Sequence, residues 1–190
     1  MKAGEPRSAL GPELRFLARR HPRASWAAHP NLGELARFWL QRHQMFRRLD
    51  ENLRTGTEAA LAGPVEPAAF KSWLARHLQI FLWQLEEHHQ VEDIHYFPVF
   101  RRLEPRLTAG FELLEGDHRG LHAALGGIVE VANRALAHED ADLTRFRAGL
   151  ARFRDAEVSL GRTLLRHLDD EEDLVVPLLL EREAALLGGG

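Results

Sequence analysis

The sequence predicts an all-α protein, an antiparallel up-down four-helix bundle, and three observations lead to this prediction. Leu, Ala, Arg and Glu dominate over Val, Ile and Thr, so strand-forming stretches are few. Apolar residues recur at intervals of three and four along four long stretches, which is the period of an amphipathic helix. The two halves of the chain also repeat one another, so we expect two similar helical hairpins with pseudo-two-fold symmetry.

Each helix is expected between recognisable breaks. The first spans about 31–55 and is followed by "RTGTEAALAGPVEP", whose Gly and Pro residues interrupt the pattern. The second spans about 67–104 and ends at "LEPRLTAG". The third spans about 108–136 and ends before "AHEDAD", and the fourth runs from about 142 to the "LLGGG" terminus.

Residues 1–25 are predicted to form a basic N-terminal arm or short helix, and we assign the bundle to residues 26–190. The arm carries five arginines, which are Arg7, Arg15, Arg19, Arg20 and Arg23. It lacks a known nucleic-acid-reading motif, so we interpret it as a solvated short helix that caps the bundle.

The composition excludes several classes of site and partner. Hydrophobic residues make up 45% of the 190 residues, enough for a sizeable core, and the formal charge of −3 gives no general attraction to nucleic acid or anionic membrane. The chain has no cysteine, which excludes disulfides, thiolate zinc sites and cysteine-held iron–sulfur clusters. The N-terminus lacks the apolar core of a secretion signal, and no run approaches the roughly 20 apolar residues that span a bilayer. We therefore expect a soluble, cytoplasmic protein without nucleic-acid or membrane partners.

An internal repeat relates the two predicted hairpins. "HHQVEDIHYFPVF" from His88 aligns without a gap with "HLDDEEDLVVPLL" from His167, 79 residues later. "HQMFRRL" from His43 lies over "HRGLHAAL" from His118, 75 residues later. Each half therefore carries a His on its first helix and, on its second, a His followed four residues later by an acid.

Residues four apart lie on one face of a helix, so the repeat places imidazoles and carboxylates inside the bundle. The members of this cluster are His43, His88, Glu92, His118, His122, His167 and Glu171. Burying them without partners would be costly, whereas a pair of divalent or trivalent ions satisfies both the imidazole nitrogens and the carboxylates. Such mixed ligands with an open position favour iron, with manganese or zinc as alternatives.

Pro98 and Pro177 each lie ten residues past the His of their helix, and we expect these helices to end or kink there.

Other residues near these motifs are expected to have ordinary roles. His89 lies about 100° round the helix from its neighbour and is expected at a helix boundary or in solvent. Asp169, Asp170 and Asp173 of "DDEED" are expected on a solvated face. Trp39 is expected to pack in the core or at a helix interface.

Four motifs give the chain a family resemblance. In order, "RHQMFRRL", "HHQVEDIHYFP", "DHRGLHAAL" and "RHLDDEEDLVVP" resemble those of the hemerythrin-like, cation-binding HHE family over about residues 30–182. The resemblance implies a four-helix bundle that holds two non-haem iron ions with a bridging oxo or hydroxo group.

The resemblance also implies a role for each member of the cluster. One iron would take two imidazoles, those of His43 and His88. The other would take three, those of His118, His122 and His167. The carboxylates of Glu92 and Glu171 would bridge the two ions. Oxygen-carrying invertebrate hemerythrins place the last carboxylate five residues after its His, which here is Glu172, whereas the longer bacterial-type members place it four residues after, which is Glu171. The internal repeat favours Glu171.

Three classes of function are consistent with these residues. The first is a binding protein for O2, NO or peroxide, acting as a sensor, store or scavenger. The second is an enzyme, either a di-iron oxidase or a peroxide- or NO-consuming protein, although the Glu-x-x-His signature of ferritin-like oxidases falls on the second and third helices instead of the second and fourth. A role in iron-centre repair is less supported, because those family members carry a cysteine-bearing N-terminal segment. The third class is a structural bundle with bound zinc.

Overall fold

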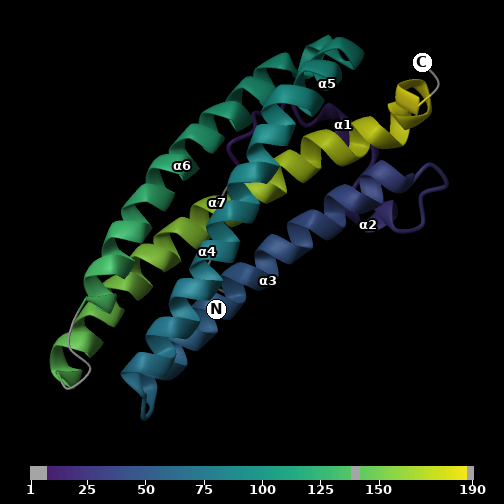
Figure 1. The fold of residues 1–190 in the computed structure, drawn as a ribbon. Coiled ribbons are helices and arrows are strands. Elements are labelled where there is room, and N and C mark those ends of the chain that lie inside the picture. The colour runs from purple at the N-terminus through teal and green to yellow at the C-terminus, as the bar shows by residue number, and fades with distance from the viewer. Residues whose placement is uncertain (1–7, 138–141, 188–190) are drawn as a thin grey trace. The chain divides into compact units, whose positions relative to one another are not determined.

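The structure is a computed structural model that describes residues 8–137 and 142–187, and every regular element within these ranges is helical (Figure 1). The four long helices are α3 (Glu34–Ala62), α4 (Pro67–Val91), α6 (Thr108–Leu136) and α7 (Leu143–Leu187). Between α4 and α6 lie the π-helical turn η1 (Glu92–Tyr96), the short helix α5 (Phe97–Leu103) and the 3-10 turn η2 (Pro105–Leu107). The predicted all-α helical bundle is confirmed. None of the helices in the described ranges is long and apolar enough to cross a membrane.

The first long helix, α3, runs to Ala62 instead of ending near residue 55, because Gly56 does not break it. A Cβ at Gly56 would collide with the indole ring of Trp73 on α4. The glycine therefore permits a close approach between two helices. Glu66 then caps α4, and its carboxylate accepts the backbone N–H of Ala69 at 2.6 Å.

The two repeated prolines lie in different backbone settings. Pro98 is near the start of α5, directly after η1, where the N–H of Phe97 bonds to the carbonyl of Glu92 five residues back. Because Pro98 has no N–H to continue the ordinary ladder, a wider π-turn at this point fits the sequence. Pro177, in contrast, lies inside α7, which continues to Leu187. The expected interruption therefore occurs beside Pro98, whereas α7 does not end near Pro177.

The segment before α3 contributes to the core. It forms two short helices, α1 (Phe16–Arg20) and α2 (Arg23–Trp26), where the sequence predicted an arm or one short helix. Three of its leucines are buried in one apolar cluster with residues of α5, α6 and α7; they are Leu10, Leu14 and Leu17. The segment was expected as a solvated short helix that caps the bundle, and its apolar face is covered by these contacts.

The chain divides into two compact units, each described here by itself. The first unit comprises the described residues up to Met45, His89–His118 and the described residues from Leu165. The second comprises Phe46–His88 and Arg119–Leu164. Each long helix contributes residues to both units. In the second unit, Arg147 of α7 donates to the carbonyl oxygens of Leu61 and Gly63 at 2.6 Å each, which ties α7 to the end of α3.

Candidate metal centre

Two groups of buried metal-ligand side chains lie in the first unit. In the first group, ligand atoms of His43 on α3, Glu92 at the start of η1 and Glu171 on α7 lie within 4.8 Å of one another. All three side chains are fully buried or nearly so. Nε2 of His43 lies 3.1 Å from Oε1 of Glu171. Three separate stretches of sequence therefore meet at one point in the core.

The second group consists of three imidazoles. Ligand atoms of His89, His118 and His167 lie within 4.8 Å of one another, and all three residues are buried. The rings of His89 and His118 stack, with centroids 4.0 Å apart, and the ring of His167 lies at 4.8 Å from that of His118 in an edge-on arrangement. Three imidazole nitrogens gathered in this way suit a first-row transition metal such as iron or zinc.

Two carboxylates connect the groups. Glu171 points one oxygen to each group, because its Oε2 lies 3.2 Å from Nε2 of His167 while its Oε1 lies near His43. Oε2 of Glu92 lies 3.6 Å from Nε2 of His118. Both carboxylates are therefore placed as bridging ligands between two ions would be.

The outer nitrogens of the imidazoles face a second set of carboxylates. Nδ1 of His118 lies 2.8 Å from Asp93, and Nδ1 of His43 lies 3.1 Å from Glu172. Nδ1 of His167 lies 3.7 Å from Asp117. A carboxylate on Nδ1 keeps the proton there and directs the Nε2 lone pair inward, as in carboxylate–histidine–metal arrangements.

The π-turn explains how two consecutive acids serve the same imidazole. Glu92 lies by Nε2 of His118 and Asp93 lies by its Nδ1. On a regular helix, neighbouring side chains point about 100° apart. The wider turn that starts at Glu92 changes the direction in which the side chains of Glu92 and Asp93 point. Such π-turns are frequent at functional sites.

Unsatisfied atoms at the centre of the first unit provide a test of whether ions fit. Nε2 of His118, Nε2 of His167 and Oε2 of Glu171 are buried and, although they face one another or Glu92 at 3.2 to 3.6 Å, their geometry makes no hydrogen bond within the described part of the chain. Leaving such atoms without a partner costs free energy, so a native core normally supplies one. Imidazole nitrogens and carboxylate oxygens are the usual ligands of iron, manganese and zinc, and the donor set therefore fits metal ions.

Charge within the centre is unevenly distributed. Burial alone would raise the pKa of Glu171, but His43 and His167 outweigh it and hold that pKa well below its ordinary value. Burial together with the charge of Glu171 raises the pKa of Glu92 well above its ordinary value. Burial would lower the pKa of His43, yet Glu171 and Glu172 raise it to about 9. Two carboxylates this close cannot both be ionised without cations, which bound metal ions would supply.

Two further residues support the carboxylates. Nε1 of Trp39 donates to Oε1 of Glu171 at 2.5 Å. Arg23 of α2 donates to Oε2 of Glu172 at 2.5 Å and to Oδ1 of Asp173 at 2.7 Å. The N-terminal segment therefore reaches His43 through one carboxylate, and Trp39 has a polar role in addition to the packing role expected of it.

The remaining predicted ligands are His88, His122 and Glu172. His88, which belongs to the second unit, is 9% exposed, and its ring lies 4.9 Å from that of Phe46. His122, also in the second unit, has its Nδ1 2.6 Å from Oε2 of Glu86, and its side chain is 34% exposed. Glu172 contacts His43 from outside the first group. The ligand roles of these three residues stay predictions.

Three expectations are wrong. His89 is buried at 1% exposure, not at a boundary or in solvent. The repeat itself carried a signal for this, because the matching residue of α7 is the fully buried Leu168. Asp170 and Asp173 are also buried, since the N-terminal segment covers them: Asp170 accepts the N–H of Ala9 at 2.9 Å, and Asp173 accepts from two arginines of that segment. Only Asp169 of the three aspartates remains exposed, at 54%.

Comparison with known proteins agrees with the geometry. The chain matches the model of the hemerythrin HHE cation binding domain over residues 34–179. No curated protein and no solved structure gives a significant match. The matched region contains both groups of ligand side chains and the carboxylates between them. The chain therefore belongs to the hemerythrin family of HHE cation-binding domains and is a metal-binding protein.

Proposed function

We propose that the chain is a non-haem di-iron protein that binds O2, NO or peroxide at an open iron position, as a sensor, store or scavenger. The observation that carries this proposal is the position of Glu171. Its two oxygens lie 3.1 and 3.2 Å from imidazole nitrogens of two separate groups, as expected of a carboxylate that bridges two ions.

The proposed ligand set gives the two ions different surroundings. One ion takes His43, and we add His88, which lies one turn before Glu92 on the same continuous stretch of helix. The other ion takes His118 and His167. Its third imidazole is His89, which stacks on His118, in the position that the family resemblance gave to His122.

Glu92 and Glu171 would complete both sites, and the ion held by two imidazoles would have fewer protein ligands and so leave room for a small ligand. When bound, iron supplies the redox chemistry and the coordination position for a small ligand. The protein's own residues hold the site rigid and dry. Asp93 and Glu172 retain protons on outer imidazole nitrogens. Phe97 stacks on His118 with centroids 5.6 Å apart, and the buried ring keeps bulk water from that imidazole.

Metal stoichiometry tests the proposal. The chain would be loaded with Fe(II) without oxygen, desalted and analysed for iron per chain, with parallel samples loaded with Mn(II) and Zn(II). About two irons per chain are expected from the two ligand groups. Optical titration with O2 and NO would then show whether the loaded site binds either gas. Iron near zero with zinc retained would favour the structural zinc-bound alternative.

A further inference from the structure

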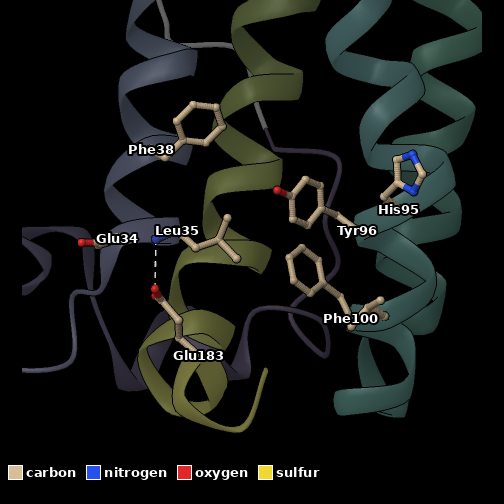
Figure 2. A pocket seen from close by; sticks show the side chains of 8 residues that line it. Glu34, Leu35, Phe38, His95, Tyr96, Phe100 and Glu183 are labelled. Atoms are coloured by element: carbon tan, nitrogen blue, oxygen red, sulfur yellow. Dashed lines mark hydrogen bonds between the residues drawn. The ribbon is translucent and has the colours of Figure 1, made fainter. Parts of the chain in front are cut away.

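A pocket of about 540 Å³ lies in the first unit between α3 and the η1–α5 segment (Figure 2). Its volume lies in the range that holds small organic molecules and is far larger than a diatomic gas needs. Apolar and aromatic side chains make up most of its wall: Leu35, Phe38, Tyr96, Val99 and Phe100. In Figure 2, Leu35 and Phe38 extend from α3 on one side, and Tyr96 and Phe100 extend toward them from the other.

The pocket has an unusual exposed aromatic ring at its edge. Phe38 is 56% exposed, although large aromatic rings are normally covered. It faces the edge of Tyr96 across the pocket in Figure 2. A planar apolar group placed between these rings would cover Phe38 and bury its own surface.

The charges around the pocket select against anions. The acidic and basic side chains that line it in the described part of the chain are Glu34, Glu183 and His95, with neither Lys nor Arg, and the phenol of Tyr96 is neutral near pH 7. Negative charge next to aromatic ring faces attracts organic cations, since the faces carry the negative part of the ring quadrupole. Charge and wall together favour a cation with an apolar body.

One carboxylate in the pocket wall supplies a charge that attracts such a cation. Glu183 is only 6% exposed. Its Oε1 accepts the backbone N–H of Leu35 at 2.9 Å, as Figure 2 shows. Its Oε2 is buried and makes no hydrogen bond within the described residues. Water therefore screens this charge little, and a cation in the pocket is attracted to it more strongly than to an exposed carboxylate.

We infer that this pocket binds a small organic ammonium ion that carries an aromatic or similarly apolar group. The ammonium group lies on the side of the pocket lined by Glu34 and Glu183, and the apolar group lies against Phe38, Tyr96 and Phe100. The inference uses residues outside the candidate metal ligands, so it stands whether or not the di-iron proposal does.

The occupied pocket would also contact the metal centre through a single side chain. Tyr96 and Phe100 both lie against Trp39, with ring centroids 5.1 and 5.7 Å away. Trp39 in turn donates to Glu171. A change in the optical spectrum of the loaded protein on ligand binding is therefore a second readout, and this one rests on the proposed function.

Calorimetric titration with three probes of similar shape tests the inference. The probes are 2-phenylethylamine, 2-phenylethanol and 3-phenylpropionate, titrated into the full chain as purified with its metal content recorded. The amine is expected to bind at least about tenfold more tightly than the alcohol, because a charge-assisted hydrogen bond exceeds a neutral one by roughly 1.4 kcal/mol or more. The anion is expected to bind more weakly still. Equal binding of amine and alcohol, or no amine binding up to about 10 mM, would overturn the inference.

Three variants locate the site. Glu183→Gln keeps an oxygen for the Leu35 N–H but removes the charge, so the preference for the amine over the alcohol is expected to disappear. Phe38→Ala changes an exposed side chain, so the fold should stay intact, and it is expected to weaken the binding of both the amine and the alcohol. Ile94→Ala removes another exposed side chain, 65% exposed and outside the pocket wall, and is expected to change neither. An amine preference that survives in Glu183→Gln, or wild-type affinity in Phe38→Ala, would contradict the assignment.

Discussion

Each unit of the molecule contains a pair of buried carboxylates that can be compared, Glu92 and Glu171 in the first and Asp50 and Glu157 in the second, and imidazoles lie beside the pair in the first unit. Glu92 and Glu171 of the first unit lie within 3.6 Å of histidine nitrogens. In the second unit, Asp50 and Glu157 are 8% and 2% exposed. Both oxygens of Glu157 are buried without a hydrogen bond in the described part of the chain.

The same residue type therefore responds in opposite ways. The pKa of Glu171 is held well below its ordinary value, because two imidazoles outweigh the effect of its burial. Burial and the negative charge of Asp50 raise the pKa of Glu157 to about 7, and burial with the charge of Glu51 raises that of Asp50 to about 6. Glu171 is thus held in its anionic form by the two imidazoles beside it, whereas burial and neighbouring carboxylates make Glu157 take up a proton more readily. Removing imidazoles from the first unit, or the charge of Glu157 from the second, tests this difference.

The largest expected effect is on metal content in the first unit. His167→Ala removes the imidazole next to Glu171, so the chain is expected to lose at least one of its two ions. His21→Ala is the matched control, because His21 pairs with Glu181 away from both ligand groups. Elemental analysis after iron loading measures the difference. Equal iron in the two variants would contradict the assignment.

A second pair of variants assigns the third imidazole. His89→Ala is expected to leave one ion per chain, because only two imidazoles of its group remain. His122→Ala is expected to keep both ions, since this side chain is partly exposed and lies by Glu86. Iron per chain measured in parallel distinguishes them, and the reverse result would return the ligand role to His122.

A smaller effect is expected from the outer carboxylates. Asp93→Asn removes the charge that faces Nδ1 of His118, so metal affinity is expected to fall about 10- to 100-fold. Competition with a coloured chelator for Co(II) measures this affinity. Asp155→Asn, at a 68% exposed position, is the control and should match the wild type. Unchanged affinity in Asp93→Asn would show that this carboxylate does not support the ligand.

The smallest effect concerns proton uptake in the second unit. The pKa of Glu157 rises from an ordinary 4.5 to about 7 in the folded chain, so the folded state binds more protons between these values. The free energy of unfolding should therefore fall by roughly 2 kcal/mol as pH rises through this window, and Glu157→Gln should flatten the decline. Urea unfolding at pH 5 and pH 8 measures it, with the 71% exposed Glu130→Gln as control. A variant curve parallel to the wild type would mean that Glu157 is not the group responsible.

The repeat predicted the parts of the site that lie on regular helical faces. His43, His118 and His167 follow from helix periodicity and from the match between the halves, as do Glu92 and Glu171. The third long helix was also predicted, and it occurs at Thr108–Leu136. These features depend on local spacing, which a single sequence contains.

The rest depends on contacts between distant segments or on departures from regular helix. Arg23 reaches Glu172 across 149 residues, and no periodicity reports such a contact. The burial of Asp170 and Asp173 follows from the same N-terminal segment. Trp39 resembles any core aromatic in the sequence, and its hydrogen bond to Glu171 depends on three-dimensional placement.

His89 is an intermediate case, because its matching residue Leu168 indicated an inward position. The predicted ligand cluster rests only on the charged and histidine positions of the repeat. Apolar residues at matched positions also report which way a side chain points, and here they identify a buried imidazole.

Anomalous diffraction from crystals of the iron-loaded chain tests the central claim most directly. Two iron peaks are predicted, one bounded by His43, Glu92 and Glu171, and the other bounded by His89, His118 and His167. A single peak, or a second peak beside His122 with His89 outside its coordination shell, would contradict the account.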